Sequence, residues 1–161
     1  MLDIMTAALK NSLHGKYIHI DPLKALQNLT PDMAVKKPEK SGHSCWDILH
    51  HIVFWQDLML EAIRGSEKVN WPENNEPSWP SNIENDDDWD ELLERFRVGL
   101  EESYKMTENI DSLDELPGWP KVPIFRALMV LGQHNAYHIG EIVATRQALG
   151  LWPPSKDHKT F

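Results

Sequence analysis

The stretch "IFRALMVLGQHNAYHIGEIVATRQALG", residues Ile124–Gly150, decides the fold of this chain. Pro123 precedes it, and proline suits the first turn of a helix because that turn needs no backbone N–H. Gly150 and the "PP" just beyond it end the helix, since glycine adopts the backbone conformation of a helix end and proline cannot continue a helix. The first half of the stretch is apolar nearly all round, which predicts a helix buried deep within a bundle.

Apolar residues at spacings of three and four predict three more helices. Ser44 is the expected N-cap of the second, and Asp47, three residues later, favours a helix start there. The aspartates of "NDDDW", residues 85–89, suit the positive end of the dipole of the third helix. The fold class is therefore all-α, a four-helix bundle with helices at about residues 2–13, 44–65, 85–110 and 123–150.

Long connections join the first helix to the second and the second to the third. Residues 65–85 form a link far longer than the roughly 2–8 residues that an antiparallel helix pair needs. Because this link can run back along the second helix, we expect the second and third helices to be parallel. Trp71 and Trp79 are expected to pin the link onto the bundle. The other connection, residues 15–43, is expected to contain a helical turn around residues 23–29.

Composition restricts the classes of protein to which the chain can belong. Its 161 residues suit one domain, residues 1–161. Its net charge of −9, from 16 basic and 25 acidic residues, argues against a nucleic-acid partner. No apolar run approaches the roughly 18 residues of a membrane span. Cys45 is the only cysteine, is expected to be a small core residue, and permits no intrachain disulfide. A soluble, cytoplasmic protein is expected.

His134 and His138 form the first candidate site. Residues four apart lie on one face of a helix, so the two imidazoles can point at one metal ion. The motif differs from the HExxH of zinc proteases, because Asn135 follows the first histidine and supplies no general base. From this pair alone, two interpretations remain open: metal ligands, or two solvated histidines on a helix surface.

Glu141 lies on the same face, seven residues after His134. It could be a fourth ligand, a hydrogen-bond acceptor for a ligand histidine, a base for bound water, or an exposed and solvated side chain. The two other polar side chains nearby, Asn135 and Tyr137, are expected to face neighbouring helices.

His51 is the candidate third ligand. It lies in the apolar segment "ILHHIVFW", and an inward-facing histidine needs a polar partner. Its neighbour His50 points about 100° away and shares a stripe with His43 and Asp57 that is expected to be solvated. His51 alone would be interpreted as a hydrogen-bonded core histidine. Together with the convergent pair of the last helix, it is better explained as a metal ligand.

A set of three histidines, His51, His134 and His138, leaves a coordination position open for water or substrate. This is typical of a catalytic rather than a structural metal site, because a metal lowers the pKa of a bound water or thiol. Glu141 is the candidate catalytic residue that would assist proton transfer.

Two segments resemble motifs of a known family. "HSCWDILHHIVFWQ", residues 43–56, and "QHNAYHIGEIVATRQALG", residues 133–150, are similar to the motifs of the DinB/YfiT-like family of small metal-binding four-helix bundles. The resemblance places the metal ligands at His51, His134 and His138, and it extends over most of the chain. One departure is at Glu141, where relatives commonly carry Gln.

The resemblance implies an up-down-down-up bundle, a divalent metal (zinc, nickel or iron) and a homodimer. Some relatives are thiol-dependent S-transferases that act with bacillithiol or mycothiol, and others have no known activity. The leading hypothesis is therefore a metal-dependent thiol S-transferase or hydrolase-like enzyme, acting on a low-molecular-weight thiol or another small molecule. The alternative is a non-enzymatic dimeric stress-response or interaction module with a structural or vestigial metal site.

Overall fold

The computed structural model describes residues 2–39, 42–80, 87–110 and 113–155. Within these residues the chain is mainly helical, as predicted. The long helices are α1 (Leu2–Leu13), α4 (Cys45–Ile63), α5 (Asp87–Met106) and α6 (Ile124–Ala148). The predicted start of the third helix at residues 85–86 lies outside the described residues, as do residues 81–85 of the long link.

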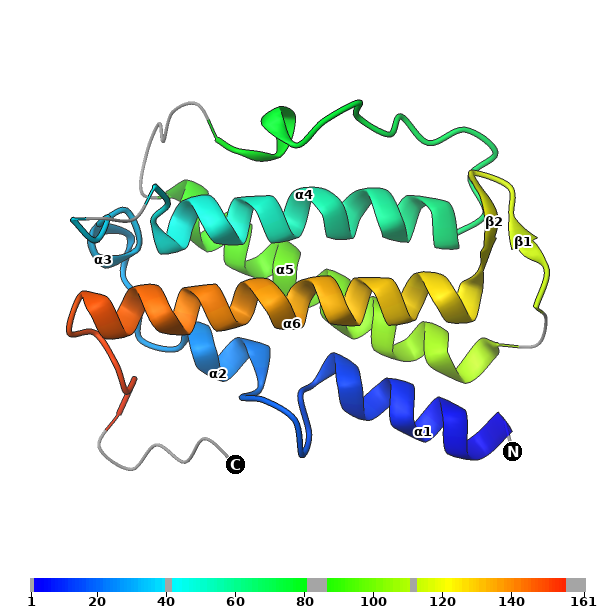
Figure 1. Cartoon of the computed structure of the whole chain (residues 1–161), viewed down its shortest axis with the longest axis horizontal. Helices are drawn as coiled ribbons and strands as arrows, with labels where there is room; N and C mark the ends of the chain where they lie inside the picture. The colour runs from blue at the N-terminus through cyan, green and yellow to red at the C-terminus, as the bar shows by residue number, and fades with distance from the viewer. Residues whose placement is uncertain (1, 40–41, 81–86, 111–112, 156–161) are drawn as a thin grey trace.

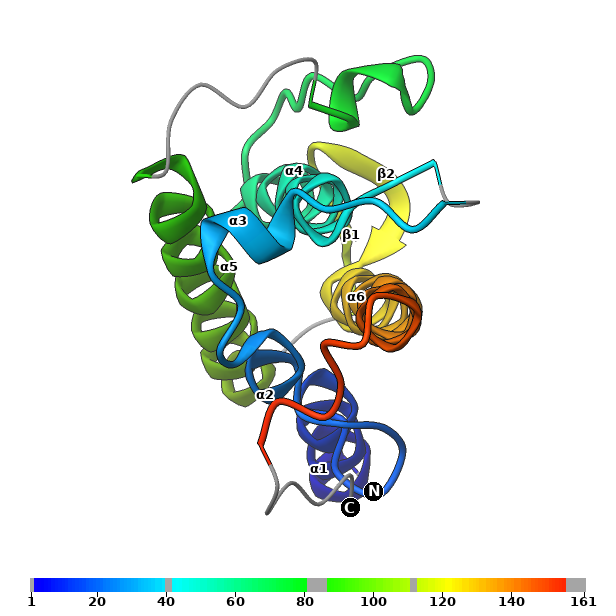
Figure 2. The ribbon, with the colours of Figure 1, turned by 90° about the vertical axis from the view of Figure 1, so that its left-hand side faces the viewer.

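Helices α4 and α6 lie side by side at the centre of the molecule, with α5 packed on α4 and α1 packed on α6 (Figures 1 and 2). In Figure 1, α4 and α5 both run from left to right, whereas α1 and α6 run from right to left. The part of the long link that follows α4 passes back over this helix toward its N-terminal end. Asn135 contacts Gln56 and Ile142 contacts Cys45, so the first half of α4 lies opposite the second half of α6.

The predicted cap of α4 is confirmed. The Ser44 hydroxyl accepts a hydrogen bond from the Asp47 N–H at 3.1 Å, and the Asp47 carboxylate accepts one from the Ser44 N–H at 2.9 Å. These two bonds satisfy backbone donors that the first turn of a helix otherwise leaves without partners. They set where α4 begins, and therefore which of its residues point toward α6.

The short elements lie in the connections. The predicted turn in the first connection is present as α2 (Pro22–Leu26), followed by α3 (Pro31–Ala34). The 3₁₀ turns η1 (Glu76–Ser78) and η2 (Thr107–Asn109) lie after α4 and α5, respectively. A hairpin of β1 (Glu115–Leu116) and β2 (Trp119–Pro123) precedes α6. Such short strands show no measurable alternation of apolar and polar residues, which explains why the sequence did not predict them.

Trp71 pins the long link, as expected, but onto the hairpin. Its indole N–H donates to the Gly118 carbonyl at 2.9 Å, and its ring lies 4.8 Å from that of Trp119. Gly118 has to be glycine here, because a Cβ would lie 2.4 Å from the Ser66 carbonyl oxygen. None of the helices in the described part of the chain is both long and apolar enough to cross a membrane.

A buried amide network fixes α4 relative to its two neighbours. Gln56 is fully buried, and its amide donates to the Arg95 and Phe96 carbonyls of α5 at 3.4 Å. Asn135 of α6 donates to the Gln56 carbonyl oxygen at 3.4 Å, so the expectation that Asn135 faces a neighbouring helix is confirmed. Gly99 leaves room for this amide, because a Cβ there would lie 2.0 Å from its nitrogen.

Cys45 and Arg146 are buried where the N-terminal end of α4 lies beside the C-terminal end of α6. Cys45 is fully buried, as expected for a core residue, and burial raises the pKa of its thiol to about 11. The Arg146 guanidinium donates to the Ala25 carbonyl at 2.5 Å and to the Leu151 carbonyl at 3.2 Å. Arg146 thereby ties α2 and the segment after α6 to the C-terminal end of α6.

Candidate metal centre

Three histidines converge between α4 and α6. His51 of α4 is 3% exposed, and His134 and His138 of α6 are partly buried. One ring nitrogen from each lies within 4.8 Å of the others. The ring centroids are 5.2 Å apart for His51 and His134, and 4.5 Å apart for each of the other two pairs. The structure thus brings together the three residues that the sequence singled out.

The long link determines which nitrogen of His51 is free. His51 Nδ1 lies 2.7 Å from the Ser78 hydroxyl, and this hydroxyl donates its proton to the Asn75 carbonyl at 2.5 Å. Because a serine hydroxyl has one proton, it can only accept from His51, whose Nδ1 therefore carries the hydrogen. Nε2 is left with its lone pair, the form in which a histidine binds a metal.

Glu141 determines which nitrogen of His138 is free. Its carboxylate oxygen Oε2 accepts a hydrogen bond from His138 Nδ1 at 2.6 Å, which leaves Nε2 with the lone pair. A carboxylate behind a ligand histidine fixes the ring and raises its basicity. Of the alternatives considered for Glu141, this geometry favours the hydrogen-bond acceptor. The side chain is 41% exposed, so it also reaches solvent.

The remaining histidine has a buried nitrogen with no partner. His134 Nδ1 is inaccessible and makes no hydrogen bond with any described group, and the same holds for the neighbouring Asn135 Oδ1. A buried polar atom without a partner is costly, and ligation of a metal by Nδ1 itself would offset that cost. Three imidazoles, two of them held with Nε2 free, are a donor set that a divalent transition metal could use.

The family follows from a comparison of the sequence with models of protein families. The sequence model of the DinB superfamily matches residues 21–142, which span α2 to the second half of α6. This chain belongs to the DinB superfamily. The matched region contains all three histidines and Glu141. Comparisons with curated proteins and with solved structures found no match.

Two rings of this DinB-superfamily protein are held neutral by their surroundings. Burial is the main reason that the pKa of His51 is lowered to about 3, and electrostatic interactions with the neighbouring imidazoles, first His138 and then His134, contribute to the same lowering. Burial lowers the pKa of His134 to about 4, with a contribution from His138 that the Asn135 side chain partly offsets. Neutral imidazole is the form that ligates a metal, so both rings are ready to bind at neutral pH.

The metal-free protein is expected to lose stability as the pH falls. In the unfolded chain these histidines protonate near pH 6.5, but in the folded chain only near 3 and 4. Between these values the unfolded state binds more protons than the folded state. The free energy of unfolding therefore decreases as the pH decreases, by up to roughly 2 kcal/mol per histidine at about pH 5. Urea unfolding of the chelator-treated protein at neutral and acidic pH measures this change. A His51→Ala/His134→Ala double variant should show a shallower dependence, and an equal one would contradict the assignment.

A cavity of 470 Å³ opens beside His138. One wall is Trp79, whose ring stacks on His51 at 4.3 Å and on His43 at 3.9 Å. Glu141 also faces this cavity. The complete lining consists of His43, Ile48, Trp79, Tyr137, His138, Glu141, Ala144 and Thr145. Trp79 therefore holds the link on the bundle, as expected, but at the histidine cluster itself.

One expectation about the surroundings was wrong, and a second holds only in part. Tyr137 faces no neighbouring helix: it is 68% exposed and lies edge-on to His138, with the ring centroids 5.0 Å apart. Helical periodicity identified its face, but in the described structure no helix covers that face. The stripe containing His50 and His43 is not simply solvated, because His50 donates to the Ser78 carbonyl at 2.8 Å and His43 stacks on Trp79. The η1 turn of the long link folds over this side of α4.

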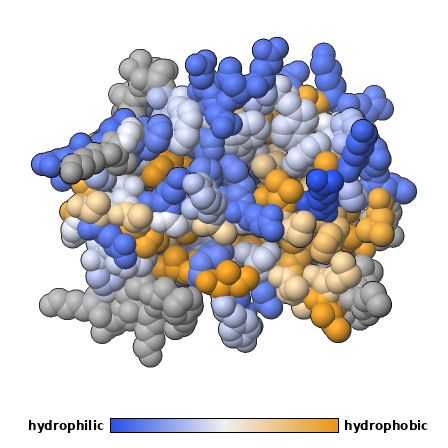
Figure 3. Space-filling model, in the orientation of Figure 1, coloured by the Kyte–Doolittle hydropathy of each residue, from blue (hydrophilic) through white to orange (hydrophobic). Residues whose placement is uncertain are grey.

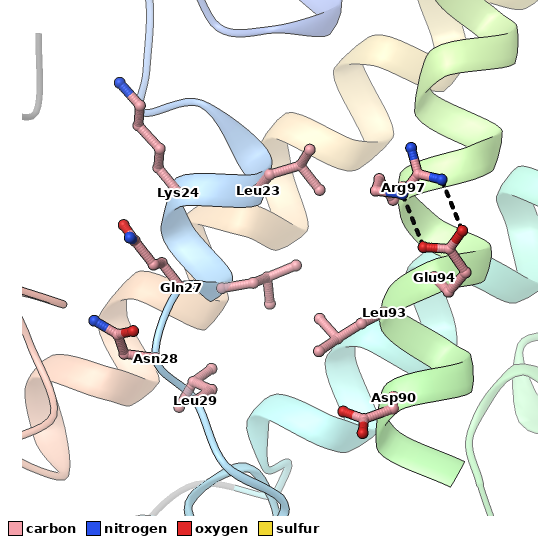
Figure 4. A pocket seen from close by; sticks show the side chains of 10 residues that line it. Leu23, Lys24, Gln27, Asn28, Leu29, Asp90, Leu93, Glu94 and Arg97 are labelled. Carbon is pink, nitrogen blue, oxygen red and sulfur yellow. Dashed lines mark hydrogen bonds and ion pairs between the residues drawn. The ribbon is translucent and has the colours of Figure 1, made fainter. Parts of the chain in front are cut away.

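A second cavity, of 570 Å³, lies between α2 and α5, and its lining differs from that of the cavity beside His138 (Figure 4). Leu23 and Leu93 project into it from opposite sides, and Glu94 and Arg97 pair at its rim through bonds of 2.7 and 2.8 Å. Its lining contains no histidine or cysteine. Of these two cavities, the smaller one is therefore the one lined by a candidate metal ligand, His138.

Proposed function

We propose that this DinB-superfamily protein binds a divalent transition metal (zinc, nickel or iron) through His51, His134 and His138. We further propose that it is a thiol S-transferase or a hydrolase acting on a small molecule. The observation that carries the proposal is the set of three converging imidazoles, two of them with Nδ1 held by an acceptor, beside a cavity of 470 Å³. The match to the DinB superfamily supports the same assignment.

The donor set favours a catalytic role for the site. Structural zinc sites have four protein ligands, whereas catalytic sites commonly have three and leave a position for water or substrate. A metal held there would act as a Lewis acid and lower the pKa of a thiol or water. The chain supplies the rest of the site: Trp79 and Ile48 form apolar walls of the cavity, and the Glu141 carboxylate faces it.

Glu141 is proposed to have two roles. One oxygen accepts the hydrogen bond from His138 at 2.6 Å, and the carboxylate, 41% exposed, also faces the cavity. A carboxylate within reach of a thiol or water can take its proton. We therefore propose Glu141 as the proton acceptor of the reaction.

Glu141→Gln separates these two roles. Glutamine keeps an oxygen that can accept from His138 Nδ1, but it cannot take up a proton at neutral pH. We expect metal content close to that of the wild type and turnover lower by about 100-fold, the lower range for loss of a general base. Metal analysis and steady-state kinetics measure the two effects. Glu141→Ala, which loses both roles, should also bind metal more weakly; unchanged turnover in the Gln variant would rule out the proton-acceptor role.

The proposed function is tested by metal content and by turnover. Elemental analysis of the untagged protein should find an equimolar transition metal. A panel of low-molecular-weight thiols with electrophiles, extended to ester and amide substrates, should then reveal turnover that a chelator abolishes. Absence of turnover across the panel, with metal present, would favour the alternative of a non-enzymatic interaction module.

The remaining proposals concern assembly and location. Exposed hydrophobic side chains include Ile4 (77%), Met5 (41%) and Met129 (38%), and Figure 3 shows hydrophobic surface at its lower right, over α1 and the start of α6. Exposed apolar surface of this kind supports the proposal of a homodimer; light scattering in solution measures the molar mass.

The helix directions of Figure 1 support an up-down-down-up bundle. A single, buried cysteine is compatible with the proposed cytoplasmic location.

A further inference from the structure

Ser78 connects the long link to both histidines of the "HH" pair. It is fully buried at the end of η1. Its hydroxyl accepts from His51 Nδ1 at 2.7 Å and donates to the Asn75 carbonyl at 2.5 Å. Its carbonyl accepts from His50 Nδ1 at 2.8 Å. One residue of the link therefore contacts two successive side chains of α4.

The direction of these bonds fixes the tautomer of His51. A backbone carbonyl cannot donate, so the Ser78 proton must point to Asn75 and the hydroxyl lone pair must face His51. Without the hydroxyl, His51 Nδ1 would lose its acceptor, and the proton could move to Nε2. In that tautomer Nε2 has no lone pair to offer a metal.

We propose that Ser78 is a positioning residue of the metal centre: it holds His51 in the tautomer whose Nε2 can ligate, and it thereby couples metal binding to the closure of residues 75–79 over α4. This inference rests on the metal site proposed above. Ser78 itself is neither a ligand nor a catalytic residue, because it acts only through His51.

Metal binding at His51 and the hydrogen bond from His51 to Ser78 are coupled through the positive charge of the metal. A cation on Nε2 draws electron density from the imidazole and makes Nδ1–H a stronger donor, so metal binding strengthens the bond to Ser78. Trp79 follows directly and stacks on His51 at 4.3 Å, so the same closure places a wall of the 470 Å³ cavity. Thermodynamic reciprocity requires that the bond favour the metal by the same factor as the metal favours the bond.

Ser78→Ala tests the proposal, with Ser103→Ala as the matched control. Ser103 is also fully buried, and its hydroxyl donates to a backbone carbonyl, that of Leu100 in α5, at 2.8 Å. Zinc affinity is measured by competition with a chromophoric chelator. We expect Ser78→Ala to bind zinc about 10- to 100-fold more weakly than wild type, the range for loss of a partner behind a metal-ligating histidine, and Ser103→Ala to bind as the wild type does.

A second measurement reads the tautomer directly in the metal-free protein. Two-bond ¹H–¹⁵N NMR spectra, recorded where His51 is neutral, should show Nδ1–H alone in the wild type and in Ser103→Ala. They should show a mixture of both tautomers in Ser78→Ala. Ser78→Thr retains a hydroxyl, and we expect it to keep the wild-type tautomer, which keeps the test available if the alanine variant does not fold.

Hydrogen exchange tests the coupling. The Ser78 amide donates to the Asn75 carbonyl at 3.1 Å and the Trp79 amide donates to the Glu76 carbonyl at 3.2 Å, so both amides report closure of the link. Zinc should slow their exchange in the wild type by about the factor that Ser78→Ala costs in zinc affinity, and should slow it less in Ser78→Ala.

The outcomes separate this inference from the proposed function. If Ser78→Ala keeps a single Nδ1–H tautomer and the wild-type zinc affinity, Ser78 does not position His51, although the metal site itself stands. If the wild type binds no zinc through His51, the proposed function fails and the coupling fails with it. The tautomer in metal-free protein still decides the positioning role in that case: an unchanged tautomer in Ser78→Ala overturns it.

Discussion

His51→Ala is expected to weaken zinc binding by about two to three orders of magnitude. Structural zinc sites with four ligands have apparent binding free energies of about 10–16 kcal/mol, so each ligand accounts for roughly 2.5–4 kcal/mol, and tenfold in affinity is about 1.4 kcal/mol. His51 is also the only one of the three histidines that comes from α4, so its loss leaves His134 and His138 as a weak pair on α6. Competition titration with a chromophoric chelator measures the affinity.

The control for this variant is His14→Ala. His14 is a partly buried histidine beyond the end of α1, 3.4 Å from the Asp21 carboxylate, and it belongs to none of the contacts of the cluster. Its removal should leave zinc affinity unchanged. Equal affinities for the wild type and His51→Ala would show that the converging histidines do not hold the metal.

Trp89→Ala is expected to have the largest effect on stability. Trp89 is 1% exposed, lies 5.3 Å from the ring of Trp46 in α4, and donates its indole N–H to the Leu29 carbonyl at 3.1 Å. The substitution removes a large buried ring from between α5, α4 and the first connection, and leaves a buried carbonyl without its donor. We expect the free energy of unfolding to fall by about 3–5 kcal/mol, as found for buried aromatic residues replaced by alanine.

Chemical denaturation of the metal-free protein measures this loss, with Val98→Ala as the control. Val98 lies on the same helix but is 46% exposed, so its truncation should change stability by no more than about 0.5 kcal/mol. Similar losses for the two variants would mean that Trp89 does not anchor α5. Using metal-free protein keeps zinc binding from contributing to the comparison.

Features encoded within a few residues of one another were predicted correctly from sequence. The Ser44–Asp47 cap, the inward position of His51 and the shared face of His134 and His138 all depend only on helical geometry. The overall helical class follows from the same periodicity. For Glu141, sequence placed the side chain on the correct face but left its role open, since a fully extended carboxylate and one folded back onto His138 have the same spacing.

Features that depend on the path of a loop were not predicted. Ser78 is one of several polar residues in the long link, and no periodicity marks it as the partner of His51. The same path explains why His50 is bonded rather than solvated and why Trp79 lies at the cluster. The prediction for Tyr137 was wrong for a related reason. A helix pattern shows which residues share a face, but not whether another element covers that face.

The distribution of the histidines along the chain has a consequence for the order of assembly. His134, His138 and Glu141 belong to one helix, so their mutual geometry arises as soon as that part of α6 is helical. His51 joins them only when α4 has docked, a contact between distant parts of the chain that forms late because closing a long loop is entropically costly. Metal taken up during refolding would therefore first meet two imidazoles and then three, so a rise in affinity would mark the moment at which the native helix pair closes.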